Sequence, residues 1–390
     1  MFRDITLDPK FFHCYQPIFT TTRFLGLNPL TCHRTPKSYL LKWSWTLYSF
    51  NCVLIAILTI LGFYGLESYI KAGTDGFVWS KFTQNHFLSI LDFAELQLLG
   101  FYFVVVQPFG FKHFAEMMDG FGKIDSLFPD FESENERRLC IIFGSGVFVV
   151  FSMVLVFDGI VVWRNVNGTE LGLKDYTFYL VYFVLIGFEL QYWQLVGFIE
   201  RRMRRINKNL KHSDENSHRL IFNAMIGYEH IYDVINWINK IYNIQISVFF
   251  GNSIHNNTRK FQLIISSCFL RIVLNLYVLI LSIIHKDETV LLFLQVAWIL
   301  LYFIRFVIIL EVCHSCELQH QKTLNLIFTL ITRIVRDDTK DILKNFSLKL
   351  TQNKIRFCCF AIPRINRSLF VTICSSITTF LIIFIQFTKL

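Results

Sequence analysis

The sequence predicts an all-α protein that crosses a membrane seven times and carries additional cytosolic helices. Three observations lead to this fold class. The 390 residues are 53% hydrophobic and include 43 phenylalanines, and the mean hydropathy is +0.45. A soluble core of this size needs less apolar surface, whereas a polytopic membrane protein also presents apolar residues to lipid. In addition, Lys and Arg gather in alternate polar segments, and the last apolar run carries a regular polar series.

Seven apolar runs are long enough to cross the hydrocarbon core, which requires about 20 residues of helix. They lie at 39–66, 82–107, 139–163, 176–199, 262–286, 290–312 and 368–387. The first ten residues are charged and contain no apolar segment, so no cleavable signal peptide is expected. The first span is therefore predicted to serve as both signal and anchor.

The distribution of basic residues predicts a cytosolic N-terminus and an external C-terminus. The segments 1–38, 108–138, 200–261 and 313–367 contain 29 of the 38 Lys and Arg residues. The loops on the opposite side contain four, which are Lys71, Lys81, Arg164 and Lys174. The net charge of +9 therefore indicates topology, and we expect no nucleic-acid partner.

This topology bears on glycosylation and on the class of protein. Asn-X-Ser/Thr sequences occur at Asn167, Asn256, Asn345 and Asn366, and Asn167 is the one predicted to lie outside. A cytosolic N-terminus is the reverse of the arrangement in G-protein-coupled receptors. The sequence has no internal repeat and no matching pair of Gly/Pro-broken spans, as an inverted-repeat transporter would have.

The same topology divides the chain into six parts. These are a cytosolic N-terminal segment (1–38), four spans (39–199), a cytosolic helical extension with a loop (200–261), two spans (262–312), cytosolic anchor helices (313–367) and the last span (368–390). Two cytosolic parts have apolar residues at alternating spacings of three and four, which predict helices with a heptad seam. One seam is Ile221, Ala224, Tyr228, Ile231, Ile235, Ile238 and Tyr242, and the other is Leu324, Ile327, Ile331 and Ile334. Each seam must pack on another surface, either within one subunit or between subunits.

The last span has a polar stripe along one side. Its members are Thr372, Ser375, Thr379 and Gln386, with Ile382 and Ile383 in the missing turn. Lipid cannot satisfy hydroxyl and amide groups, so the stripe is expected to face something polar. A water-filled pore lined by copies of this helix would satisfy it. Packing of small polar residues against another helix is the alternative, and periodicity leaves both open.

The end of this span resembles the signature of the insect gustatory receptors, which is Thr-Tyr, five apolar residues and Gln-Phe. Here Thr379-Phe380 is followed by LIIFI and then by Gln386-Phe387, so Phe380 is the departure from that pattern. The segments FSLKL (346–350), NRSLF (366–370) and QPIFTTTRFLGLNPL (16–30) are also similar to the family.

Three features depart from the family further upstream. Ala361 stands where the family often has Gly, and Pro363 is unusual at its position. The stretch ISVFFGNSIHNNTRKFQ (246–262) interrupts the helical pattern before the fifth span. We expect it to be a poorly packed loop, and either a genuine loop or an insertion in the gene model would explain it.

The resemblance implies a receptor for a small-molecule tastant that acts as a ligand-gated, non-selective cation channel in the plasma membrane. It also implies four subunits, identical or of related receptors, which the cytosolic helices join around one pore. The pore and gate residues would then be Thr379, Ile383, Gln386 and Phe387. The alternative is a seven-helix receptor that signals through a cytosolic partner without conducting ions.

Charged residues are costly inside a membrane, so each one indicates a binding site or an internal ion pair. Arg271 and Glu189 lie near the middle of the bilayer and are predicted to pair with each other. In the outer half, aromatic faces and a few polar groups would suit a small ligand. The residues of this candidate pocket are Asp158, Tyr179, Tyr182, Gln295 and Trp298. In spans so rich in Phe and Tyr, such a grouping also arises by chance.

Other chemistry has little support in the sequence. Cys313, Cys316 and His320 share a helix face, but a zinc site needs a fourth ligand and none is placed, so no metal is expected. Most of the ten cysteines lie in cytosolic or apolar parts, and no structural disulfide is expected. The sequence contains no Gly-rich phosphate loop, nucleophile triad or metalloprotease motif. It therefore predicts neither an enzyme nor a cofactor.

Overall fold

The structure is a computed structural model, and most of the chain is described in it. The described residues are 5–35, 38–74, 79–105, 110–128, 133–165, 173–213, 217–243, 269, 271–280, 283, 289–334, 336–355, 357 and 367–388. The elements are β1 (Ile5–Leu7), α1 (Pro9–Phe24), β2 (Leu30–Arg34), β3 (Tyr39–Trp43), α2 (Trp45–Thr74), α3 (Trp79–Val105), α4 (Phe111–Leu127), α5 (Ser133–Asn165), α6 (Leu173–Lys211), α7 (His218–Asn243), α9 (Thr289–Arg333), α10 (Asp337–Gln352) and α11 (Arg367–Thr388).

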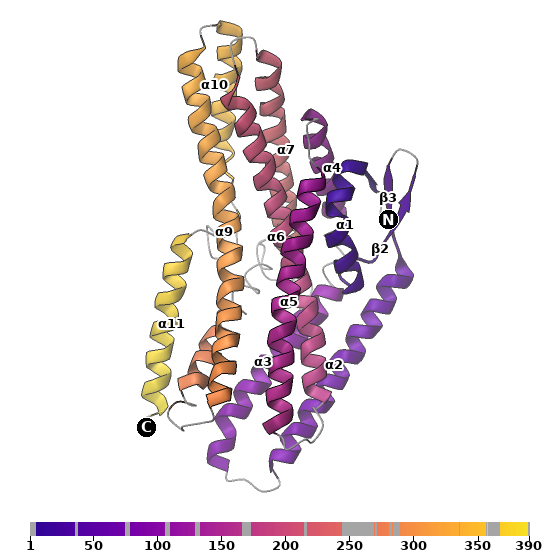
Figure 1. The fold of residues 1–390 in the computed structure, drawn as a ribbon, viewed down its shortest axis with the longest axis vertical. Coiled ribbons are helices and arrows are strands. Elements are labelled where there is room, and N and C mark those ends of the chain that lie inside the picture. The colour runs from indigo at the N-terminus through magenta and orange to yellow at the C-terminus, as the bar shows by residue number, and fades with distance from the viewer. Residues whose placement is uncertain are drawn as a thin grey trace, which may run out of the picture.

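The helices form an elongated bundle in which α6 and α9 run much of the length (Figure 1). With 45 residues, α9 is about 68 Å long at about 1.5 Å per residue, more than twice the hydrocarbon thickness of about 30 Å. It therefore extends beyond the membrane. One end of the bundle holds α7, α10 and the end of α9, while the C-terminus of α11 lies toward the opposite end.

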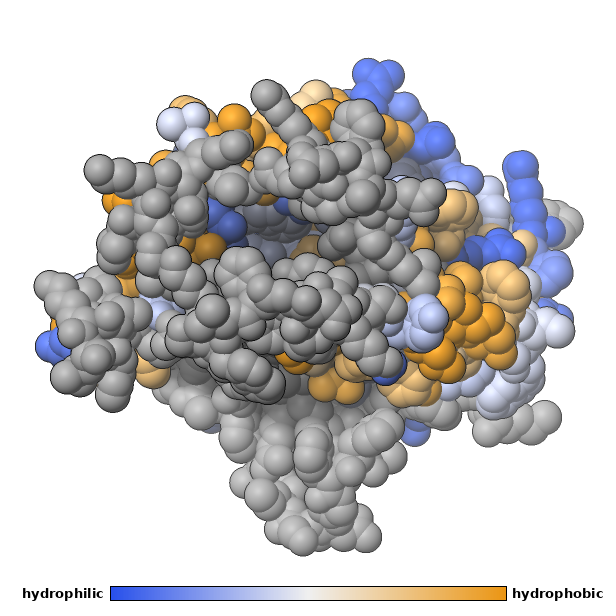
Figure 2. Space-filling model, turned by 90° about the horizontal axis from the view of Figure 1, so that it is seen from below, coloured by the Kyte–Doolittle hydropathy of each residue, from blue (hydrophilic) through white to orange (hydrophobic). Residues whose placement is uncertain are grey.

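Each of the seven predicted spans overlaps an apolar helix. Four helices are long and apolar enough to cross a membrane, at Trp45–Glu67, Glu134–Val161, Tyr176–Lys211 and Leu292–Arg333. Shorter apolar helices occur at Phe93–Val105, Arg271–Ile280 and Phe370–Ile383. Seen from the end nearest the C-terminus, much of the coloured surface is hydrophobic, as expected for helices that face lipid (Figure 2).

The prediction of an all-α fold was wrong at the N-terminus, where three short strands form an antiparallel sheet in the order β1-β3-β2. Residues 39–43, predicted to begin the first span, form the central strand β3. Ser44 follows, and its Oγ accepts a hydrogen bond from the Leu47 backbone N–H at 3.3 Å, so it caps α2. The apolar run hid this boundary, because a short apolar strand and the first turn of a span have the same hydropathy.

The first heptad seam is buried within one subunit. All seven of its members on α7 are at most 4% exposed, and α4 packs along this helix. Tyr228 contacts the Thr323 hydroxyl of α9, and burial raises the pKa of Tyr228 above its usual value. On the second seam Ile327 and Ile334 are buried, while Leu324 and Ile331 are half-buried. The structure thus shows the packing within one subunit that the sequence had left open.

A close approach of α3 and α6 at Gly100 gives a stability prediction. A Cβ placed on Gly100 would lie 2.2 Å from Cγ1 of Val181, a stiff β-branched side chain. Gly100→Ala is therefore expected to destabilise the protein by about 1–3 kcal/mol through overpacking. Gly146→Ala on α5 is the control, because a Cβ there meets no atom within 4 Å. Thermal unfolding of both variants in detergent would measure the difference, and equal melting temperatures would contradict the prediction.

Candidate functional site

A cluster of aromatic rings lies where α5, α6 and α9 meet. The Tyr182 ring is fully buried and stacks on Phe151, with ring centroids 4.8 Å apart. The Trp298 centroid lies 5.5 Å from that of Tyr182 in an edge contact, and Trp298 stacks on Tyr302 at 5.6 Å. Phe178 is a further neighbour of Tyr182, at 5.8 Å. These five rings form a rigid apolar surface with two phenolic groups and an indole inside it.

Two arginines lie against this aromatic cluster. The Arg305 guanidinium carbon is 5.1 Å from the Tyr182 ring centroid and 5.6 Å from that of Tyr302. The Arg271 guanidinium carbon is 5.6 Å and 5.8 Å from the same two rings. Both arginines are buried, so these cation–π contacts form away from bulk water, where they are strongest.

The predicted ion pair between Arg271 and Glu189 was wrong. Glu189, which is 1% exposed, receives a bidentate interaction from Arg305, with Nε 2.8 Å from Oε2. Arg271 instead lies 3.6 Å from a carboxylate oxygen of Glu95 on α3, and its Nη1 donates to the Tyr302 hydroxyl at 3.3 Å. The prediction rested on the similar depth of Arg271 and Glu189 in the bilayer, and depth could not show which helix faces Glu189 on α6.

The five residues of the predicted ligand pocket fall into two groups. The Tyr179 hydroxyl donates to Oδ2 of Asp158 at 2.7 Å, and both side chains are half-buried. Tyr182 and Trp298 belong to the aromatic cluster. Gln295 lies one turn before Trp298, and its Oε1 is buried without a hydrogen bond from any described residue. Ligand binding by these residues stays a prediction.

Sequence reasoning missed Tyr302 and Arg305 as members of this site. They follow Trp298 by four and seven residues, which places all three on one face of α9. That spacing was available in the sequence. Phe178 precedes Tyr182 by four residues on α6, so the same spacing argument applies to it. Arg271 could not be found in this way, because its contacts link different helices.

The last helix, α11, stands beside α9 at the edge of the bundle (Figure 1). Its packed face carries Ile377, which is buried, and Phe370, whose ring lies 5.5 Å from that of Phe303 on α9. The predicted polar stripe points away from this contact. Thr372, Ser375, Thr379, Ile382, Ile383 and Gln386 are all exposed. The side chain of Phe387 lies outside the described residues.

Four hydroxyl groups of α11, those of Ser375, Ser376, Thr378 and Thr379, donate to its own backbone. Ser375 Oγ donates to the Val371 carbonyl at 2.9 Å, and Thr379 Oγ1 donates to the Ser375 carbonyl at 3.0 Å. Each hydroxyl proton is thereby used inside the helix, while oxygen lone pairs remain directed outward. The exposed face thus presents acceptors and apolar methyl groups, which is compatible with water or a cation on that side.

Two other predictions concern residues that lie outside the described part of the chain. These are the glycosylation site Asn167 and the stretch 246–262. Cys313 and Cys316 are described and buried, and their sulfur atoms lie 3.3 Å from the Tyr192 hydroxyl and 3.6 Å from the Val196 carbonyl. Within the described part of the chain, no three His, Cys, Asp or Glu side chains are placed to hold a metal ion.

Comparison with known proteins identifies the family. The model of the 7tm chemosensory receptor family matches residues 15–259 and 261–390, which is nearly the whole chain. The chain belongs to the 7tm chemosensory receptor family. This confirms the resemblance read from the C-terminal motif, and it confirms a multi-pass membrane receptor rather than an enzyme.

Relatives of this chemosensory receptor are found by both sequence and structure. It is 21% identical to the gustatory receptor for sugar taste 43a of Drosophila melanogaster over 95% of this chain and 97% of the relative. It is 30% identical to the putative gustatory receptor 28b of the same species, over 32% of this chain and 28% of the relative. The insect olfactory receptor OR5 from Machilis hrabei has the same fold, with a TM-score of 0.64, 12% identity and coverage of 95% and 97% of the two chains. The structure of OR5 in complex with eugenol matches with a TM-score of 0.57.

The bond between Tyr179 and Asp158 gives a test of the ligand site in this receptor. Tyr179→Phe removes the hydroxyl that orients the Asp158 carboxylate and keeps the ring. We expect the dose–response curve for an activating ligand to shift to at least about tenfold higher concentration, since a hydrogen bond to a charged group is worth about 1.5–3 kcal/mol. Tyr176→Phe, an exposed position on the same helix, is the control. Identical curves at equal surface expression would contradict this site.

Proposed function

We propose that this chain is a gustatory receptor that acts as a ligand-gated, non-selective cation channel in the plasma membrane. The observation that carries the proposal is the polar stripe of α11, which faces away from the rest of the subunit. A membrane helix needs a polar environment for such a face. Four copies of α11 around one axis would provide it, with Thr379, Ile383 and Gln386 lining the pore.

The chemistry of the stripe suits a gate of low selectivity. Rings of Ile383 and Phe387 would exclude water when narrow and so block ions by dewetting. The neutral amide of Gln386 offers a carbonyl oxygen to a cation once the ring widens. The α11 sequence contains no acidic residue, so nothing in it would favour one cation strongly over another.

Assembly would rest on the cytosolic helices. Their inner faces pack within the subunit, but several large apolar side chains on them stay exposed. These are Phe222, Leu318, Phe328 and Leu348. Such exposed residues suit contacts between subunits, either in a homotetramer or with related receptors.

A small-molecule tastant is the proposed ligand, and the aromatic cluster with its rim pair Asp158 and Tyr179 is the proposed pocket. A relative is named as a receptor for sugar taste, and OR5 has been solved in complex with eugenol. Sugars are therefore the first class to test, followed by aromatic alcohols. In the proposed topology the N-terminus is cytosolic and Asn167 carries the glycan, which glycopeptide mapping would test.

The decisive experiment is current recorded from the purified full chain in liposomes. We expect cation current on addition of a ligand that raises calcium in cells expressing the receptor. Ligand binding without current from the purified protein would contradict the channel, and it would favour a seven-helix receptor that signals through a cytosolic partner.

A further inference from the structure

A cavity lies at the opposite end of the spans from the aromatic cluster. It has a volume of about 920 Å³ and lies between the end of α6 and the beginnings of α5 and α7. Among the described residues, five basic side chains line it, together with one carboxylate, that of Glu136. The basic residues are Arg201, Arg204, Arg205, Lys208 and Arg219. The cavity therefore has a strong positive potential that favours an anion.

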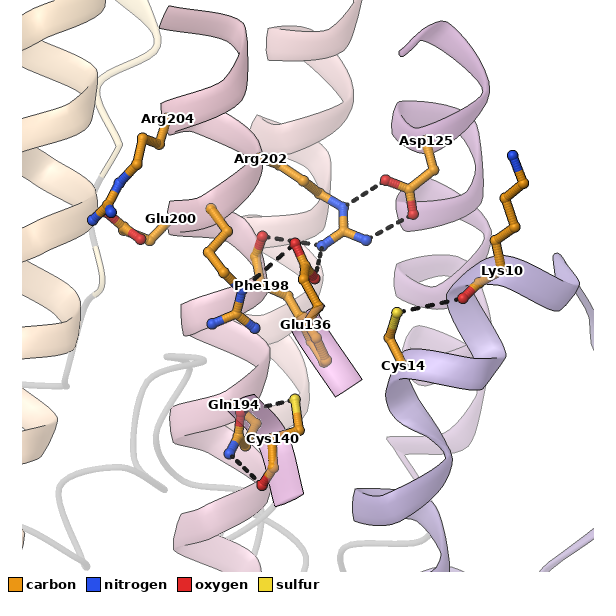
Figure 3. A network of polar contacts seen from close by, with 11 residues as sticks. Lys10, Cys14, Asp125, Glu136, Cys140, Gln194, Phe198, Glu200, Arg202 and Arg204 are labelled. Carbon is orange, nitrogen blue, oxygen red and sulfur yellow. Dashed lines mark hydrogen bonds and ion pairs between the residues drawn. The ribbon is translucent and has the colours of Figure 1, made fainter. Parts of the chain in front are cut away.

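The single lining carboxylate does not neutralise these charges. Glu136 lies 3.6 Å from Nε of Arg201 and also 3.9 Å from Nη1 of Arg202 (Figure 3). Arg202 already forms an ion pair with Asp125, with Nη2 2.7 Å from Oδ2. Glu136 is therefore divided between Arg201 and Arg202 and cannot fully neutralise Arg201. Within the described residues, Lys208 and Arg219 contact no carboxylate. Asp214 and Glu215, in the loop between α6 and α7, lie outside the described part of the chain.

The cavity also offers neutral donors. Asn135, Asn209 and Asn223 contribute amide groups to its lining, and Ser217 contributes a hydroxyl. Two long helices, α5 and α7, begin beside it, so the positive ends of their dipoles add to the arginines. The Nη2 of Arg201 is buried and donates no hydrogen bond to any described residue. Donors of several kinds thus converge on one space.

We propose that this cavity binds an anion that carries several phosphate groups, such as a phosphorylated inositol ring. Arginine forks match phosphate oxygens in pairs, and five basic groups around one space suit several phosphates better than a single carboxylate. The volume lies within the range of about 300–1,000 Å³ that holds small ligands. Leu139 lines the cavity and is 54% exposed, and it begins the exposed apolar face of α5. The cavity therefore sits at the membrane surface, within reach of a lipid headgroup as well as a soluble phosphate.

The cavity is connected to α9 by polar contacts. Arg204 lines it and donates to Oε1 of Glu200 at 2.6 Å. The same oxygen accepts from Nε2 of Gln319 and from Oγ of Ser315, both on α9 and both at 3.3 Å. If a bound phosphate formed an ion pair with Arg204 in place of Glu200, Glu200 would form stronger hydrogen bonds with Gln319 and Ser315 of α9. The proposed site therefore has a physical route by which its ligand would bias the helix that carries Trp298.

Binding to the purified full chain in detergent tests the proposal without any current measurement. The probes are inositol 1,4,5-trisphosphate, short-chain phosphatidylinositol 4,5-bisphosphate and short-chain phosphatidylserine. The cavity variant is Lys208→Gln with Arg219→Gln, two exposed positions that need not disturb the fold. The control, Lys322→Gln with Arg336→Gln, removes the same charge from exposed residues that do not line the cavity. Gel filtration establishes that both variants are folded.

We expect the two probes with a phosphorylated inositol ring, which are the trisphosphate and the bisphosphate lipid, to bind more tightly than phosphatidylserine. These two are called the phosphorylated probes. The cavity variant should weaken them at least tenfold, because each contact between a basic side chain and a phosphate is a charge-assisted bond. The control variant should leave them unchanged. Equal affinity for the two phosphorylated probes assigns binding to the phosphates, and tighter binding of the lipid assigns a membrane phosphoinositide. Absence of binding, or equal loss in both variants, would overturn the proposal and leave the channel proposal untouched.

Discussion

Replacing Arg305 by Met is expected to remove most folded receptor from the cell surface. The substitution leaves Glu189 buried, at 1% exposure, without its cation. Breaking a buried ion pair from one side costs about 3–5 kcal/mol, because a charge then remains unpaired in a low-dielectric interior. That is a large part of the roughly 5–15 kcal/mol that keeps a typical protein folded. Fluorescence-detected gel filtration of a tagged receptor would measure the folded fraction.

The double variant Glu189→Leu with Arg305→Met distinguishes loss of the ion pair from a steric effect of the new methionine. Replacing both charges by apolar groups of similar size is often neutral, so folded protein should return. Lys344→Met is the matched control, since Lys344 and Asp341 form an exposed pair, 3.0 Å apart, and such pairs are worth about 0–1 kcal/mol. Equal yields for Arg305→Met and Lys344→Met would show that the buried pair has no such role.

The largest functional effect is expected for Gln386→Ala in α11. Gln386 is exposed at the end of the polar stripe, and its amide is the group offered to a passing cation in the proposed pore. Its removal should change unitary conductance, ion preference or resting current while surface expression stays normal. Single-channel recording from the full chain, with reversal potentials in mixed salts, would detect each of these changes.

Leu381→Ala is the control for that variant. Leu381 is half-buried and packs toward the core, on the opposite side of α11 from the stripe. It should change conduction less than Gln386→Ala when currents are normalised to receptor at the surface. If Gln386→Ala left conductance, ion preference and resting current all unchanged, the stripe would not line the pore.

The sequence predicted the elements of this fold better than their partners. Hydropathy located all seven apolar helices, and the spacing of Thr372, Ser375 and Thr379 correctly grouped them on one exposed face. Hydropathy failed at residues 39–43, because it cannot distinguish the short apolar strand β3 from the first turn of a membrane span. Hydropathy also failed to predict which of two arginines, on different helices, pairs with Glu189. Arg271 and Arg305 have similar depth, and only the contact between α6 and α9 decides which one meets Glu189.

The heptad seam of α7 shows the same limit. Its period correctly predicted a buried face, because an apolar stripe on a helix in water has to be covered. The covering helices could not be named from that period, since any apolar surface would do. In the structure Tyr228 contacts α9 and α10, and Tyr242 contacts α6. Similarly, Tyr182 and Trp298 were selected for their chemistry, whereas Arg271 reaches Tyr182 only through a contact between helices.

The polar contacts between α6 and α9 restrict which insertions and deletions these two helices can tolerate. Arg305 meets Glu189, and Thr323 donates to Asn207 at 2.6 Å. Glu189 and Asn207 are 18 residues apart on α6, and Arg305 and Thr323 are also 18 residues apart on α9. This separation is about five helical turns. A single inserted residue between Arg305 and Thr323 would rotate the rest of α9 by about 100° and break one of the two pairs. Chimaeras that join the spans of one receptor to the cytosolic helices of another should therefore function only when their junctions in α6 and α9 keep this phase.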